Sequence, residues 1–130
     1  MAFGTATVFT NAGRAVVTNR LKGLGTELNY IALGVGATGA ARTAAVTDTV
    51  LSSELAEGRA NGTSSVVTTS VTNDTYQTVG TITASGVRSV DEAATFDAVT
   101  VGDMGVSATF GVVTLQNGDS LQVTARVQFN

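Results

Sequence analysis

Hydrophobic and polar residues alternate near the end of the chain. From residue 121 to residue 129 every second residue is apolar, and the residues between them are polar. The apolar positions are Leu121, Val123, Ala125, Val127 and Phe129. Because successive side chains of a strand point to opposite faces, the pattern predicts a strand with one buried face. An apolar-rich segment at 107–115 and the Asn-Gly pair at 117–118 come before it, so residues 105–129 predict an antiparallel hairpin.

Segments of similar character recur through the middle of the chain. Residues 64–72, 75–84 and 86–99 are rich in Val and Thr and are separated by turn residues. Stiff β-branched side chains favour a pleated sheet, and short strands at this spacing are typical of sandwiches and barrels. The predicted fold class is mainly β: an antiparallel β-sandwich or jelly-roll-like barrel with one short N-terminal helix.

Residues 10–23 alone have the pattern of a helix. Thr10 or Asn11 can cap its start, and Gly23 can end it. Its apolar side consists of Val16, Val17 and Leu21. We therefore expect a single domain over residues 1–130, with a strand-like N-terminal arm at 1–9, a helix at 10–23 and a β-rich body at 28–130.

A glycine pattern after a short apolar run suggests a dinucleotide-binding loop. The spacing G-x-G-x-x-G is made by Gly34, Gly36 and Gly39. Glu54 or Glu57 follows at about the distance of an acidic ribose ligand. Such a loop needs a helix after the third glycine and then a parallel strand, but the downstream sequence is Thr-rich and alternating, as in antiparallel sheets. We interpret the segment as a glycine-rich loop leaving a strand, and we expect no cofactor.

The composition excludes several classes of function. The chain has no His and no Cys, which removes thiol nucleophiles, the usual metal ligands and the most common general base. We expect no catalytic residues and no enzyme activity. The net charge is −3, and 13% of the residues are charged, so no basic field attracts nucleic acid or a membrane surface. The apolar runs are shorter than the roughly 20 residues that cross a bilayer.

Four acidic residues could in principle hold a hard cation. Asp91 and Glu92 are adjacent, and Asp97 and Asp103 follow within the next turn region. Their spacing differs from that of a calcium-binding loop. We interpret them as solvated turn residues and expect no metal site.

Five segments in colinear order carry a resemblance to a known family. They are "TNAGRAVVTNRLKG", "YIALGVGATGAARTAAVTDTVLSSEL", "NDTYQTVGTITA", "VDEAATFDAV" and "GDSLQVTARVQF". Together they cover nearly the whole chain, and the chain resembles small virion structural proteins of tailed bacteriophages. One segment departs from the expected pattern, since Ala94 and Thr95 replace a Gly-Leu pair.

The resemblance implies a component of the virus particle, located in the virion after assembly in the host cytoplasm. The leading interpretation is a capsid decoration (cement) protein that binds the assembled head and stabilises it, with the major capsid protein as its partner. The alternative is a tail, baseplate or fibre-associated protein with tail proteins as partners. We expect a homo-oligomer, with a trimer favoured, and no direct contact with nucleic acid or a membrane. Phe3, Val8 and Phe9 are candidate interface anchors, because an exposed apolar arm needs a surface to cover it.

Overall fold

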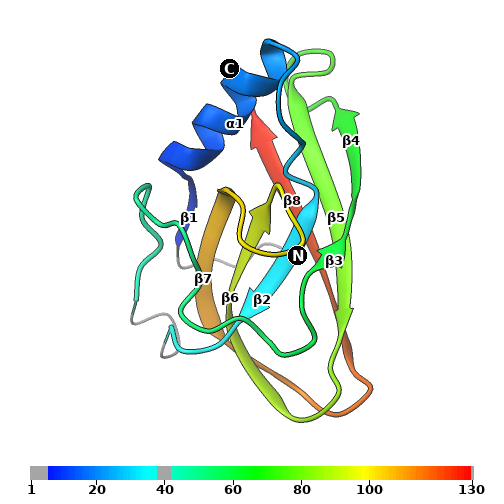
Figure 1. The fold of residues 1–130 in the computed structure, drawn as a ribbon. Helices are drawn as coiled ribbons and strands as arrows, with labels where there is room; N and C mark the ends of the chain where they lie inside the picture. Colours follow the sequence, from blue (N-terminus) through cyan, green and yellow to red (C-terminus); the bar gives the residue numbers. More distant parts are fainter. Residues whose placement is uncertain (1–5, 38–41, 130) are drawn as a thin grey trace.

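The strands form two antiparallel sheets. The structure is a computed structural model that describes residues 6–37 and 42–129 (Figure 1). The first sheet has the strand order β1-β7-β6-β2-β3 and the second has the order β4-β5-β8. The strands are β1 (Ala6–Phe9), β2 (Tyr30–Gly34), β3 (Ala60–Asn61), β4 (Thr63–Val67), β5 (Thr75–Thr83), β6 (Arg88–Phe96), β7 (Met104–Leu115) and β8 (Ser120–Gln128). The predicted antiparallel β-sandwich is confirmed, while the jelly-roll variant stays a prediction.

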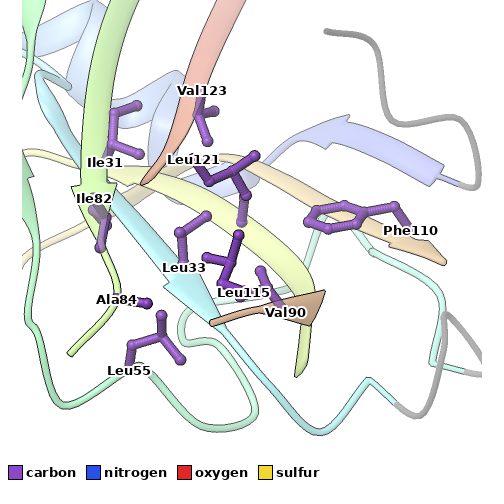
Figure 2. Close-up of a cluster of buried hydrophobic side chains, with 11 residues drawn as sticks. Ile31, Leu33, Leu55, Ile82, Ala84, Val90, Phe110, Leu115, Leu121 and Val123 are labelled. Atoms are coloured by element: carbon purple, nitrogen blue, oxygen red, sulfur yellow. The ribbon is translucent and has the colours of Figure 1, made fainter. Parts of the chain in front are cut away.

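The hydrophobic core lies between the two sheets. Apolar side chains from β2, β6 and β7 of the first sheet meet those from β5 and β8 of the second (Figure 2). The largest contributors are Ile31, Leu33, Val90, Phe110, Leu115, Ile82, Leu121 and Val123. Burying each Val, Leu, Ile or Phe side chain contributes about 1.5–3 kcal/mol relative to leaving it exposed, so this layer is the main favourable term for the fold.

The predicted strand at the end of the chain is present, but its apolar face is only partly covered. Leu121 and Val123 are buried in the core, Val127 is half-buried and Phe129 is 52% exposed. The apolar–polar alternation of β8 therefore extends past the core, to residues of the second sheet that the first sheet does not cover. The uncovered part forms one wall of the groove described below.

The predicted hairpin over residues 105–129 is wrong, although its turn is correct. β7 pairs with β1 and β6 in the first sheet, whereas β8 pairs with β5 in the second. Gly118, with φ +90°, turns the chain from one sheet to the other. The Gly118 amide donates to the Ala84 carbonyl at 2.8 Å, and the Ala84 amide donates to the Asp119 carbonyl at 2.8 Å. A turn signal is local, so it does not determine whether the strands on either side pair with each other.

The predicted helix is confirmed as α1 (Asn11–Leu21), which lies across one end of the sandwich (Figure 1). The Thr10 hydroxyl caps it by accepting from the Gly13 amide at 3.0 Å, and it also donates to the Met104 carbonyl at 2.6 Å. The cap therefore fixes the helix to β7 as well as satisfying a free amide. Gly23, with φ +85°, follows the helix in the left-handed conformation that favours glycine.

A long segment after β2 covers the outer face of the first sheet. Within residues 42–59 the structure has no helix and no strand, apart from a bridge between Glu54 and Gly34. Leu51 packs against Ala94, Phe96 and Met104 on this face. The expected body at 28–130 is thus β-rich except for this segment.

Glu57 ties the covering segment to β6. Its carboxylate accepts from the Arg88 guanidinium at 2.7 Å and from the Ser85 hydroxyl at 2.7 Å. These bonds from Arg88 and then Ser85 lower the pKa of Glu57 from its ordinary value of 4.5 to about 2. Because the pKa is lower in the folded chain, the charged group stabilises the fold above about pH 4.5, and this stabilisation is lost as the pH falls toward 2.

We therefore expect Glu57→Gln to destabilise the protein at pH 7 and to have progressively less effect between pH 4.5 and pH 2. Urea unfolding of both proteins across this range, followed by circular dichroism, measures the difference at each pH. A difference that stays constant down to pH 2 would contradict the pairing of Glu57 with Arg88.

Candidate interaction site

An apolar groove of about 460 Å³ lies between α1 and the second sheet. On the helix side it is lined by Val16, Val17 and Leu21. On the sheet side it is lined by Val66 of β4, Tyr76 of β5 and Val127 of β8. Phe9 and Phe129 also contribute to its walls. Most of these side chains are hydrocarbon, so the groove fits an apolar occupant.

The groove exists because one row of the second sheet extends past the core. Val66 is the register partner of Tyr76, and Tyr76 is the register partner of Val127, so the three residues form a continuous row across the sheet. None of them belongs to the cluster between the sheets. At this row the second sheet faces helix α1 and not a strand of the first sheet. A gap remains between the helix and the row, and this gap is the groove.

Apolar side chains at the edge of the groove are largely exposed. Leu21 is 86% exposed, Val66 is 62% exposed and Phe129 is 52% exposed. Single exposed apolar residues are common, but three around one concave apolar surface are characteristic of a binding site. This surface is the strongest candidate site in the described part of the chain.

Four polar side chains that line the groove bond to neighbouring groups of the protein, namely Arg20, Glu27, Ser64 and Tyr76. The Glu27 carboxylate accepts from the Ser64 hydroxyl and from the Tyr76 hydroxyl, the latter at 3.2 Å. Burial raises the pKa of Tyr76, so its hydroxyl stays protonated and donates to Glu27. Arg20 donates to the Gly25 carbonyl at 2.8 Å. These interactions leave hydrocarbon as the main surface offered to a ligand.

Exposed basic residues lie on α1 and directly after it. Arg14, Arg20 and Lys22 are exposed, and the helix contains no acidic residue. The protein as a whole has a net charge of −3. Of these three residues Arg20 lines the groove, and Glu27 lines it as well, so the lining holds one charge of each sign around a mainly apolar surface.

The three predicted interface anchors have different outcomes. Phe9 lines the groove, and its ring lies against Gly13 of α1. Val8 is half-buried on β1, at the edge of the first sheet, and does not line the groove. Phe3 lies outside the described residues. Three residues of the groove were not predicted as site residues, namely Leu21, Val66 and Tyr76. The continued alternation up to Phe129 indicated an apolar surface beyond the core.

The described part of the glycine pattern agrees with our interpretation, since Gly34 ends β2 and Gly36 lies in the loop that follows. Gly34 ends β2, which pairs antiparallel with β3 and β6, and residues 42–54 form no helix. Gly39 lies outside the described residues. A Cβ on Gly34 would lie 2.5 Å from a carboxylate oxygen of Glu92, so this glycine makes room for a buried acid. Neither candidate ribose ligand is free, because Glu54 pairs with Arg59 and Glu57 with Arg88.

The interpretation of the acidic residues as solvated turns is wrong for Asp91 and Glu92. They are 3% and 0% exposed, and they bond to the segment that covers the first sheet. Asp91 accepts from the Ala37 amide at 3.1 Å. The turn interpretation is right for Asp97, whose carboxylate accepts from the Asp103 amide at 2.7 Å. Within the described ranges, no three His, Cys, Asp or Glu side chains lie together as a metal site.

Glu92 is the centre of a buried polar network. Its carboxylate accepts from Arg42 at 2.7 Å and from the Ser52 amide at 2.6 Å. Arg42 also contacts Asp48 at 3.1 Å, and Ser107 donates to Asp48 at 2.9 Å. Burial acts to raise the pKa of Asp48, but the bonds from Ala45, Ser107 and Arg42 outweigh it and hold the pKa below its usual value. The network therefore fixes the covering segment to the sheet.

Comparison with known proteins identifies no relative of this chain. The chain matches no protein-family model, no curated protein and no solved structure. In the described part of the chain, no helix has the length and apolar character needed to span a membrane.

Proposed function

We propose that the protein is a structural component of a tailed-bacteriophage virion: a capsid decoration protein that binds the assembled head and stabilises it. The observation that carries the proposal is the uncovered apolar groove between α1 and the second sheet. An apolar segment of the major capsid protein occupies this groove in the bound state. The class of particle is proposed from the resemblance of five colinear segments to small virion proteins of tailed bacteriophages.

The geometry supports binding as the main activity. The groove presents hydrocarbon, and the polar groups in its lining that could act on a ligand, Glu27 and Tyr76, bond to each other. The chain also has no His and no Cys to supply a base or a thiol. A protein that binds only the assembled shell stabilises that shell by mass action, without any chemical step.

The proposed assembly includes copies of the chain bound to each other, with a trimer favoured by the resemblance. A decoration protein of this kind ties neighbouring capsid subunits together and is located in the virion. It needs no direct contact with nucleic acid or a membrane.

The test is co-sedimentation of the purified protein with heads that lack it and, separately, with isolated tails. We expect saturable binding to heads at a fixed copy number per capsid subunit. Binding to tails alone would contradict the decoration role and assign the protein to the tail, baseplate or fibre.

The groove itself is tested by Leu21→Glu, which places a charge on its apolar lining. Leu21 is 86% exposed and glutamate is a good helix former, so the fold should be unaffected. We expect head binding to weaken about tenfold or more, as for loss of an interface hot spot. Val50→Glu is the matched control, because Val50 is 69% exposed and does not line the groove. Equal binding by the two variants would exclude the groove as the site.

A further inference from the structure

β8 is the longest edge strand in the described part of the sandwich, and within that part it lacks the usual protective features. β8 has nine residues, whereas the edge strands β1, β3 and β4 have four, two and five. Its pairing with β5 shows no bulge, and it contains no Pro and no Gly. Edge strands are normally protected by short length, bulges, Pro or charges, because an open edge pairs with other chains. Its one charged residue, Arg126, donates to Gln77 on β5 at 2.7 Å and so lies across its own sheet.

The backbone groups of β8 that face outward can be identified from its register. The Phe129 amide bonds to the Asp74 carbonyl, and the Ala84 amide bonds to the Asp119 carbonyl, at the two ends of the β5–β8 ladder. In an antiparallel ladder, hydrogen-bonded pairs alternate with pairs that are not bonded. Odd-numbered residues of β8 therefore bond to β5, and even-numbered residues such as Thr124 present their N–H and C=O groups to the free edge. Within the described residues, no backbone bond from another segment reaches these groups.

A cleft opens between the sheets beside the same edge. It has a volume of about 210 Å³, and its apolar lining includes Ala93, Val106 and Ala108 of the first sheet and Val123 and Ala125 of β8. Polar residues also line it, namely Thr7, Thr95, Thr124 and Arg126. The small apolar side chains leave space at the side of the sandwich. A strand placed next to β8, with apolar residues facing inward, would cover this opening as well as satisfy the free backbone groups.

We propose that β8 pairs with β8 of a second copy of this chain, antiparallel and around a two-fold axis at Thr124. The two three-stranded sheets then form one six-stranded sheet. The inward faces of both β8 strands lie on the same side of this sheet, so Val123 of each copy lies next to Ala125 of the other and borders the cleft.

The register follows from length and charge. Thr124 is the midpoint of Ser120–Gln128, so an axis at this residue pairs all nine residues. All five outward-facing residues then meet in hydrogen-bonded pairs, and Arg126 of each copy lies opposite Gln122 of the other. An axis at residue 126 would shorten the overlap and place the two arginines opposite each other, which is unfavourable. The contact uses the backbone groups on the free edge of β8, whereas the groove uses the inward-facing side chain of Val127 near the end of the same strand.

Disulfide cross-linking tests this register directly, because the natural chain has no Cys. In a hydrogen-bonded antiparallel pair the two Cα atoms are about 5.5 Å apart, which suits a disulfide. We expect Thr124→Cys to form a covalent dimer rapidly under mild oxidation, without heads or tails present. Ser65→Cys is the control, because Ser65 is exposed on β4 at the opposite edge of the same sheet. Cross-linking of Thr124→Cys no faster than that of Ser65→Cys would overturn the proposal.

A second pair of variants tests the backbone bonds. Thr124→Pro removes an N–H that points away from β5, so it spares the internal ladder. Thr124→Val keeps the N–H and the shape of the side chain. We expect the proline variant to lose the β8 contact. By sedimentation, the mass of its assembly should be half that of the valine variant's assembly. Equal masses for two folded variants would also overturn the proposal, and the cross-linking result decides the case if the proline variant does not fold.

Discussion

Replacing Arg42 with methionine should lower the free energy of unfolding by about 3 kcal/mol. The substitution leaves the Glu92 carboxylate, which is 0% exposed, without its cationic partner. Loss of one partner of a buried pair typically costs about 3–5 kcal/mol, and the lower end applies because the Arg42 side chain is 28% exposed and partly solvated. Urea unfolding at neutral pH, followed by circular dichroism, measures the change.

The double variant Arg42→Met with Glu92→Leu is the control for this prediction. It removes both charges and fills the site with hydrocarbon, which is often neutral or stabilising for buried pairs. The Ser52 amide loses its acceptor and Asp48 loses its Arg42 partner, so some cost remains. We expect the double variant to be more stable than Arg42→Met alone. A double variant as unstable as the sum of its two single variants would show that the two side chains act independently.

Gly13→Val should destabilise the protein by about 2–3 kcal/mol, because α1 rests directly on β7 at this residue. A Cβ on Gly13 would lie 2.8 Å from the Gly105 Cα and 2.7 Å from the Phe9 ring. Backbone on one side and a ring on the other leave the new side chain no space, so the helix must move away from the sheet. The same movement changes the groove, and we expect head binding to weaken along with stability.

Gly111→Val provides the matched comparison. This glycine lies in β7, and a Cβ on it would meet no atom within 4 Å. Valine favours a strand conformation, so the substitution should be neutral or slightly stabilising. Thermal unfolding of both variants against the natural chain tests the pair, and an equal loss of stability in both would argue against a tight contact between α1 and β7.

The sequence was informative where one periodicity dominated. The strict alternation at 120–128 and the capped helix beginning after Thr10 both appear in the structure at nearly the expected bounds. Pairing between strands was not predictable in the same way, since the Asn117-Gly118 turn is compatible with a hairpin or with a crossing between sheets.

The burial of charged side chains could not be predicted from the sequence either. In the sequence, Asp91 and Glu92 resemble turn residues, and they are buried only because the segment after β2 folds over them. This segment has no hydrophobic periodicity from which its position could be predicted. The groove could not be predicted from the sequence either, because it also depends on contacts between distant segments. Val66, Tyr76 and Val127 meet through pairing of three strands, and nothing in their local sequence shows that α1 covers them incompletely.

The strand order also constrains when this protein can fold. Ala6 of β1 is the register partner of Thr109 of β7, so the first sheet is completed only by residues about a hundred positions apart in the chain. Contacts of such long range make folding slow, on the scale of milliseconds to seconds for small β proteins. β8, which carries the proposed contact with a second copy, follows the other seven described strands in the sequence. The proposed contact can therefore form only after the chain has been synthesised through β8, later than any of the pairings within β1 to β7.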